Sequence, residues 1–185
     1  MFYLSRIEHT LHIPPHLLSL PIQEAVHKEL EKLFLDKVVA NLGLCVSVYD
    51  IRSIEGGFIF PGEGAATYMV VFTLIMFRPF VGEIIAAKLL ASDSDGLRLS
   101  LGFFDDIYVP AHHMPNPSHF EGEPKNSCHC GQIKFRVQSV SYPSIPVEQP
   151  NESKPFAPMV VTGSLDHDGL GPVSWWYDTQ EIEDE

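Results

Sequence analysis

The chain has 185 residues and a formal net charge of −12 at pH 7, with 45% hydrophobic and 11% aromatic residues. This composition excludes an intrinsically disordered chain, and three unevenly spaced cysteines (Cys45, Cys128 and Cys130) exclude a disulfide framework and favour a reducing compartment. The longest apolar stretch, residues 68–77, is well short of the roughly 18 residues that a membrane span needs, so we expect no membrane.

The negative charge is concentrated in the second half of the chain. Residues 1–81 carry a net charge of −2, whereas residues 82–185 carry −10. Residues 178–185 hold five acidic side chains and no base, and we expect them to be a solvated tail. A domain with this charge repels nucleic acid at long range, so any contact with it must be local. The charge therefore favours a part of a larger assembly over a free-standing binder.

Residues 1–80 predict a small α+β domain that starts with a strand and a helix. Residues 2–7 are aromatic-rich, which favours a strand, and Pro14 and Pro15 end it because proline cannot donate a ladder hydrogen bond. From residue 21 to about residue 37 apolar residues recur at three- and four-residue spacing, which predicts a helix. Pro21 fits its first turn, where a missing N–H is harmless.

A strand meander is expected after the helix. Residues 38–51 alternate apolar and polar side chains, so they predict one long strand that Gly43 bulges or bends. Gly56 and Gly57 can supply the positive φ of a tight hairpin turn, after which residues 58–60 start a return. Residues 68–77 predict a second long strand. The helix is therefore expected to pack on one face of an antiparallel sheet.

From residue 82 the sequence changes to short strands separated by turn residues, and we place the domain boundary near Phe80. The spacing predicts an all-β barrel of the OB or S1 type over residues 81–177. Residues 111–131 and 142–158 are rich in proline, asparagine and serine and are expected to be loops. The expected strands cover residues 82–90, 97–103, 107–109, 133–140, 159–165 and 173–176.

No motif predicts catalysis, a metal site or a cofactor. Cys128-His129-Cys130 holds metal-ligating side chains, but adjacent residues splay apart and no second cysteine pair stands at finger spacing. Asp105 and Asp106 have the chemistry of an acid–base pair, but they are adjacent and lie where a turn is expected. We therefore expect no active site. The alternative is a small-molecule enzyme that uses the Cys-His cluster.

Aromatic and basic side chains in the second half have the composition of a single-strand binding face. Aromatic rings stack on unpaired bases while arginine and lysine bind phosphates, as in OB-type barrels that hold single strands. The alternative is that half of these aromatics belong to the core. The candidates for RNA binding are Arg98, Phe103, Phe104, Tyr108, Lys134 and Arg136.

Five unusual strings stand together in the sequence: His12-Ile13-Pro14-Pro15, Leu42-Gly43-Leu44-Cys45, Phe60-Pro61-Gly62-Glu63-Gly64-Ala65, Ser100-Leu101-Gly102-Phe103-Phe104-Asp105-Asp106-Ile107 and Gly169-Leu170-Gly171-Pro172-Val173-Ser174-Trp175-Trp176. Together they resemble the family of RNA polymerase stalk subunits that comprises the larger stalk subunit of eukaryotic RNA polymerase III, the polymerase II stalk subunit and their archaeal counterpart. The resemblance runs from Met1 to about Trp176. The Gly-Phe-Phe-Asp-Asp-Ile and Ser-Trp-Trp strings point to the polymerase III branch.

The resemblance implies an accessory subunit without catalytic activity of its own. Residues 1–80 would form a tip domain that docks on core RNA polymerase III, and the barrel would project outward. Both would pair with a smaller stalk subunit. Such a dimer supports initiation of transfer RNA and other short-RNA transcription in the nucleus, and its barrel contacts nascent single-stranded RNA weakly. The docking candidates by position are Phe60, Pro61, Gly62, Glu63 and Gly64.

One segment departs from the family pattern. After Pro117 the family runs into an aromatic and acidic strand, whereas here a short polar stretch ends in Cys128-His129-Cys130. The departure predicts a shortened form, through splicing or an error in the gene model, whose barrel lacks a strand and is open at that edge. We expect poor solubility without the partner. The alternative function is an autonomous S1-type RNA-binding regulatory protein with no fixed polymerase.

Overall fold

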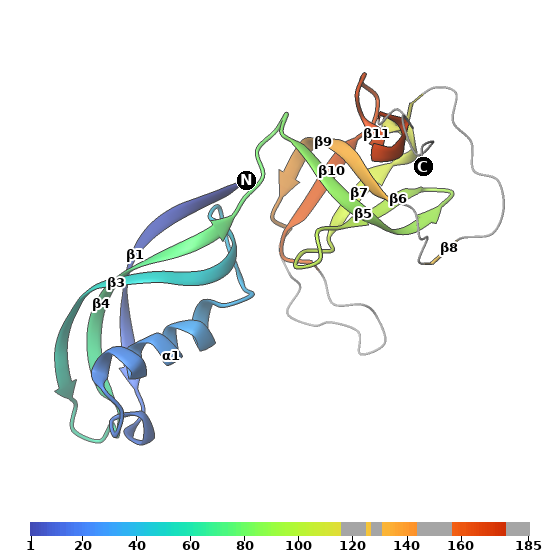
Figure 1. Ribbon diagram of the computed structural model, residues 1–185. Helices are drawn as coiled ribbons and strands as arrows, with labels where there is room; N and C mark the ends of the chain where they lie inside the picture. The colour runs from blue at the N-terminus through green and yellow to red at the C-terminus, as the bar shows by residue number, and fades with distance from the viewer. Residues whose placement is uncertain (116–124, 127–130, 144–156, 177–185) are drawn as a thin grey trace, which may run out of the picture. The chain divides into compact units, whose positions relative to one another are not determined.

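The computed structural model describes residues 1–115, 131–143 and 157–176, together with the backbone of residues 125–126. The chain divides into two compact units, Met1–Arg78 and Pro79–Glu185. Each unit has its own sheet (Figure 1).

The first unit is a four-stranded antiparallel sheet with one helix packed on it (Figure 1). The strands follow the order β1-β4-β3-β2, so β4 lies between the two other long strands. This arrangement confirms the expected α+β architecture. In chain order the elements are β1 (Phe2–Ile13), the 3₁₀ helix η1 (Pro15–Leu17), α1 (Ile22–Phe34), β2 (Val38–Val39), β3 (Gly43–Ile59) and β4 (Ala66–Phe77).

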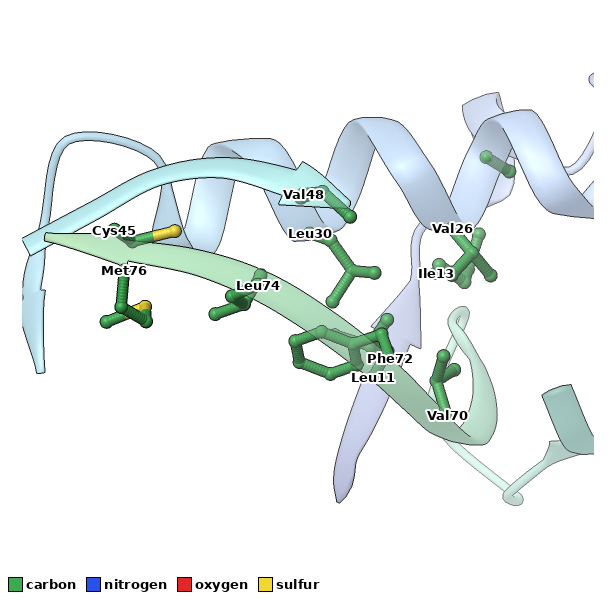
Figure 2. Close-up of a cluster of buried hydrophobic side chains, with 11 residues drawn as sticks. Leu11, Ile13, Val26, Leu30, Cys45, Val48, Val70, Phe72, Leu74 and Met76 are labelled. Carbon is green, nitrogen blue, oxygen red and sulfur yellow. The ribbon is translucent and has the colours of Figure 1, made fainter. Parts of the chain in front are cut away.

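Helix α1 covers the sheet because its apolar residues fall on one side. Val26 and Leu30 are fully buried, and Figure 2 shows them on the side of α1 that faces Phe72 and Leu74 of β4. Pro21 stands just before the first turn, as the sequence predicts. Burial of each such side chain contributes about 1.5–3 kcal/mol, so this contact holds helix and sheet together. The core consists of Leu11, Ile13, Ala25, Val26, Leu30, Cys45, Val48, Val70, Phe72, Leu74 and Met76.

Residues 38–51 do not form the single strand that their alternation predicts. The chain reverses between β2 and β3, where the Leu42 N–H donates to the Val39 carbonyl (3.0 Å), and the two strands then pair antiparallel. Gly43 opens β3 with a φ of +96°, which side chains rarely tolerate. The expected irregularity at Gly43 is present, but it belongs to a reversal that periodicity cannot reveal because both arms are apolar.

The glycine pair in the middle of this region does not form the expected hairpin turn. β3 continues through Gly56 and Gly57, and its register against β4 shifts between Gly56 and Phe58. Both glycines have positive φ, of +109° and +90°, so their conformational freedom is used in a bulge. The prediction identified the residues that leave regular strand geometry and assigned them the wrong irregular structure.

The hairpin between β3 and β4 instead turns after Ile59. The Glu63 N–H donates to the Phe60 carbonyl (3.0 Å) across Pro61 and Gly62, and Gly62 has a φ of +88°. Proline followed by a glycine with positive φ is typical of a type II turn. Two neighbouring sites in the sequence tolerate positive φ, and the pairing of β3 with β4 selects the second as the turn.

The second unit contains a closed five-stranded barrel (Figure 1). β5 pairs with β6 and β9, and β7 pairs in parallel with β10, so the strands close in the order β5-β6-β7-β10-β9-β5. A five-stranded Greek-key barrel is the OB architecture, which confirms the expected fold. The elements are β5 (Ile84–Asp93), β6 (Gly96–Ser100), β7 (Ile107–Pro110), η2 (Ala111–His113), β8 (Lys125–Asn126), β9 (Gln132–Ser141), β10 (Val160–Ser164), β11 (Gly171–Pro172) and η3 (Val173–Trp175).

The expectation of an incomplete barrel with an open edge is wrong. β5 from Ile84 to Lys88 pairs antiparallel with β9 from Arg136 back to Gln132, which joins the first barrel strand to the fourth. The chain between β7 and β9 is therefore not needed to close the barrel. The short segment after Pro117 shows that residues are missing relative to the family. It does not show whether those residues would form a barrel strand or an extension beside the barrel.

Alternation along the strands separates the inside of the barrel from its outer surface. On β9 the buried residues Ile133, Phe135 and Val137 alternate with the less buried Lys134 and Arg136. The interior is thus filled by apolar side chains, namely Ile85, Ala87, Leu97, Leu99, Phe104, Ile107, Val109, Ile133, Phe135, Val137, Met159, Val161, Leu165 and Leu170.

Strand β6 ends at Ser100, three residues before the predicted limit. The Ser100 hydroxyl donates to the Asp105 carboxylate and accepts a hydrogen bond from the Gly102 N–H (2.9 Å). These bonds close a local turn, in which the Ser100 side chain accepts the backbone hydrogen bond that strand pairing would otherwise provide. Asp105 therefore has a structural role in the turn, as the sequence indicates.

Residues 173–176 do not form the predicted final strand. Only Gly171 and Pro172 pair with β9, and the chain then winds into η3, where the Trp176 N–H donates to the Val173 carbonyl (3.1 Å). Pro172 has no N–H to continue a ladder, which a strand prediction from apolar content overlooks.

The two expected loops and the tail lie largely outside the described residues. Residues 116–124, 127–130, 144–156 and 177–185 belong to this part of the chain, and with them the Cys128-His129-Cys130 string.

Candidate interaction surfaces

The end of the β3–β4 hairpin exposes consecutive large apolar side chains. Phe60, predicted as a docking residue, is 54% exposed, and the two residues before it, Phe58 and Ile59, are 70% and 61% exposed. The remaining docking candidates of the turn, Pro61, Gly62, Glu63 and Gly64, are also exposed. We call residues 58–64 the hairpin tip.

The hairpin tip has the character of a protein-binding surface. It contains a single charged residue, Glu63, and the type II turn fixes the backbone at its end. Exposed apolar clusters on soluble units mark sites of interaction. Sequence reasoning missed Phe58 and Ile59 because it assigned them to a returning strand; their place beside the family string was the available signal.

The predicted RNA-binding residues do not form one cluster on the barrel. Arg98 on β6 and Tyr108 on β7 are direct cross-strand partners and face the outside together. Lys134 and Arg136 lie on β9, and β9 is separated from β6 by β5. The candidate set therefore divides into a pair on β6–β7 and a pair on β9.

The β6–β7 pair stands beside an acidic turn. The Tyr108 hydroxyl donates to the Asp95 carbonyl (2.6 Å), and the Asp93 carboxylate accepts hydrogen bonds from the N–H groups of Asp95 and Gly96, both at 3.0 Å. Burial and the nearby Asp95 and Asp93 carboxylates raise the pKa of Tyr108, while Arg98 acts in the opposite direction. The ring is therefore fixed by its hydroxyl, next to the exposed Arg98 side chain.

Two further candidates lie near the β6–β7 connection, and one of them is not accessible. Phe104 is 7% exposed and belongs to the barrel core, so its ring cannot stack on a base; this candidate is corrected. Phe103 is about half exposed. The two neighbouring phenylalanines thus divide between core and surface, as the alternative interpretation of the aromatics anticipated.

Lys88 belongs with the basic residues of the barrel, although sequence reasoning missed it. It is exposed on β5, where its register partners are Ser100 of β6 and Gln132 of β9. All Lys and Arg side chains that the structure describes in Pro79–Glu185 lie on β5, β6 or β9, which are contiguous in the barrel. They are Lys88, Arg98, Lys134 and Arg136. The alternation of β5 could have identified Lys88 as outward-facing.

The described residues contain no cluster of catalytic or metal-binding character. No group of three or more His, Cys, Asp or Glu side chains within them could hold a metal ion. A hollow of about 480 Å³ in the first unit is lined by Gln23, Glu24, His27, Tyr49, Asp50 and Ile51. Within residues 1–115, 131–143 and 157–176 no helix is long and apolar enough to cross a membrane.

Comparison with known proteins finds the same family in both units. A model of an "SHS2 domain found in N terminus of Rpb7p/Rpc25p/MJ0397" matches residues 8–64, and a model of "RNA polymerase III subunit Rpc25" matches residues 83–176. DNA-directed RNA polymerase III subunit RPC8 of Bos taurus is 31% identical over 201 residues, which cover 95% of this chain and 98% of that protein.

Relatives from other organisms are also RNA polymerase subunits. Subunit rpc8 of Schizosaccharomyces pombe is 32% identical over 205 residues, covering 95% of this chain and 100% of that protein. Archaeal subunit Rpo7 of Saccharolobus solfataricus is 28% identical over 107 residues, covering 58% of this chain and 59% of that protein. The aligned lengths of 201 and 205 exceed the 185 residues of this chain, so these relatives contain positions that it lacks.

Proposed function

Because this chain belongs to the family of RNA polymerase III subunit Rpc25, we propose that it serves as the larger subunit of the polymerase III stalk and pairs there with a smaller stalk subunit. The family is one of accessory, non-catalytic polymerase subunits. The observation that carries the proposal is the extent of the similarity: 95% of this chain and 98% of the Bos taurus relative are aligned, across both units. As a polymerase III subunit, the chain would act in the nucleus and support transcription initiation.

In this proposal residues 1–80 dock on the core polymerase through the hairpin tip. Phe58, Ile59 and Phe60 offer apolar surface to a protein groove, and the turn at Pro61 and Gly62 limits the conformational entropy lost on docking. Large aromatic residues in a desolvated pocket commonly dominate the binding free energy of an interface.

Residues 81–177 act as the S1-like barrel that touches nascent single-stranded RNA. Arg98 and Tyr108 support this role because they are adjacent on the β6–β7 face, which OB barrels commonly use for oligonucleotides. Phe103, Lys134 and Arg136 are further candidates for RNA contact, although they lie elsewhere on the barrel. With a net charge of −10 over residues 82–185, the contact would be weak and salt-sensitive unless the assembly holds RNA close.

Reconstitution with the smaller stalk subunit and stalk-depleted RNA polymerase III tests the proposal. We expect a one-to-one dimer on gel filtration. The dimer should then bind to the stalk-depleted polymerase. Phe58→Ala combined with Phe60→Ala should abolish docking, whereas Phe103→Ala, a matched exposed aromatic in the other unit, should not. A chain that binds RNA but neither the small subunit nor the polymerase would instead be the autonomous regulator.

A further inference from the structure

Two exposed tryptophans stand at the end of the described barrel, where the proposed function assigns no role. Trp175 is 64% exposed and Trp176 is 49% exposed. Trp176 is held in place, because its indole N–H donates to the carbonyl of the buried Leu170 (3.1 Å). Exposed tryptophans cost solvation free energy, so two of them in sequence suggest a surface that is covered by something else.

The backbone beneath Trp175 is shaped for its ring. A Cβ atom at Gly171 would lie 2.8 Å from Cζ3 and 2.9 Å from Cε3 of Trp175, so only glycine lets the indole lie this close to β11. Gly171 also has a φ of +102°, which favours glycine independently. The ring is thus supported from below, and a ligand that stacks on it would meet a surface that is already ordered.

Basic side chains extend from this ring across the barrel. Gly171 of β11 is the register partner of Lys134 on β9, and Lys134 is in turn the partner of Ala86 on β5. Arg136 lies on the same side of β9 as Lys134, since the buried Phe135 separates them. Lys88 lies two residues beyond Ala86 on the same side of β5. We call Trp175, Lys88, Lys134 and Arg136 the tryptophan face.

The tryptophan face differs from the β6–β7 face that OB barrels commonly use. It lies on β11, β9 and β5, whereas Arg98 and Tyr108 lie on β6 and β7. Three of the four Lys and Arg residues described in the second unit belong to it, although residues 82–185 carry a net charge of −10. Positive charge is therefore local, beside the most exposed indole ring of the chain.

We infer that the tryptophan face is a second binding site for single-stranded RNA, in which Trp175 stacks on an unpaired base and Lys88, Lys134 and Arg136 bind the adjacent phosphates. The inference rests on the proposed RNA contact of the barrel and adds a separate site to it. Aromatic rings interleaved with cations are what sequence-tolerant single-strand binding requires. A protein partner explains the face less well, because lysine is depleted at protein interfaces.

The chain itself provides a specific optical probe of this site. Trp175 and Trp176 are its only two tryptophans, so indole fluorescence reports on this adjacent pair, which includes the stacking ring of the tryptophan face. The full chain would be titrated at ~50 mM salt, where phosphate contacts are strong, with a fluorescein-labelled oligouridylate of about 12 nucleotides. Anisotropy of the label measures total RNA binding, and quenching of indole fluorescence measures stacking at the site.

We expect indole quenching to accompany the rise in anisotropy. Trp175→Ala should weaken binding about tenfold, which matches the usual contribution of one stacked base, whereas Trp175→Phe should bind nearly as the wild type because it keeps a stacking ring. Lys88→Ala should lower the slope of log affinity against log salt by about 1. Tyr49→Ala, an exposed aromatic in the first unit, is the matched control and should change nothing.

Two results would overturn the inference, and they differ in what they imply for the proposed function. If RNA binds without quenching and Trp175→Ala has wild-type affinity, while Arg98→Ala weakens binding, the second site is refuted and the β6–β7 contact stands. If the chain binds no RNA at ~50 mM salt, both RNA sites are refuted. Membership of the polymerase stalk would then still be decided separately by reconstitution with the core enzyme.

Discussion

The hairpin tip and the basic side of the barrel are two surfaces of opposite chemistry on one chain. The tip presents Phe58, Ile59 and Phe60 with one charged residue, while the barrel presents outward-facing Lys and Arg side chains on β5, β6 and β9. Apolar surface binds by desolvation, which salt affects little; phosphate contacts weaken steeply with salt. Under the proposed function, this contrast suits the first unit to a protein partner and the second to a polyanion.

Loss of a core aromatic ring should destabilise the barrel, and with it the basic surface, more than any other change considered. Phe135 is fully buried in the barrel, and its ring lies 2.6 Å from where a Cβ at Gly163 would be, so Gly163 has no side chain that could fill the space that Phe135→Ala would leave. We expect a loss of about 3–5 kcal/mol in the free energy of unfolding. Denaturant unfolding, followed by far-UV circular dichroism, measures it. A loss below about 1 kcal/mol would contradict the assigned core.

Removal of the aromatic rings of the hairpin tip should weaken docking on the polymerase without changing the stability of the fold. Phe58→Ala combined with Phe60→Ala is expected to weaken binding to the core polymerase by at least about 2 kcal/mol, because exposed aromatics that fill pockets dominate interfaces. Since both rings are mostly exposed, the free energy of unfolding should stay within about 0.5 kcal/mol of the wild type. Pull-down with immobilised polymerase and thermal melting measure the two quantities. Retained docking would show that the tip is not the docking site, and a destabilised chain would show that the tip has a structural role.

A smaller effect is expected for the β6–β7 face. Arg98→Ala should lower RNA affinity several-fold at low salt and reduce the salt slope by about 1, while docking on the polymerase stays unchanged. Fluorescence anisotropy across a salt series measures the slope. Equal loss of RNA binding and docking would mean that the two surfaces are not separate in function.

The smallest effect is a pH dependence of the barrel. Burial and the Asp95 and Asp93 carboxylates raise the pKa of Tyr108 above its ordinary value of 10.0. The neutral phenol is therefore favoured in the folded state, so its stabilisation is complete below the unfolded pKa and is lost as pH rises through the folded pKa. We expect Tyr108→Phe to lose less stability between neutral and strongly alkaline pH than the wild type does. Parallel unfolding curves for the two proteins across that range would contradict this assignment.

Much of the fold follows from periodicity and turn chemistry. The helix, β4 and most barrel strands were predicted because buried faces impose a period of 3.6 or 2 on their residues. The errors occurred where tertiary pairing selects between local options: Gly56 and Gly57 became a bulge, and the chain reversed between β2 and β3 within what resembled one strand. The closing contact between β5 and β9 is non-local, so no local pattern could show that the barrel is complete.

The candidate surfaces were predicted less fully than the fold. Residue type identified Arg98 and Tyr108 as candidates and the family resemblance identified Phe60, and all three are at least partly exposed. Type alone could not separate Phe103 from its buried neighbour Phe104, because both follow the end of β6 in irregular structure. Lys88 became a candidate only when register placed it beside β9, and Trp175 only when its ring was found against Gly171, the register partner of Lys134.

Whether this chain is a stalk subunit is decided by counting its copies on RNA polymerase III in cells. The polymerase would be purified through a tagged catalytic subunit and its composition measured by quantitative mass spectrometry. Stalk membership through the hairpin tip predicts one copy per polymerase for the wild type and for Arg98→Ala, and near-complete loss for Phe58→Ala with Phe60→Ala. Absence of the wild-type chain from intact polymerase, or full occupancy by the tip variant, would contradict it.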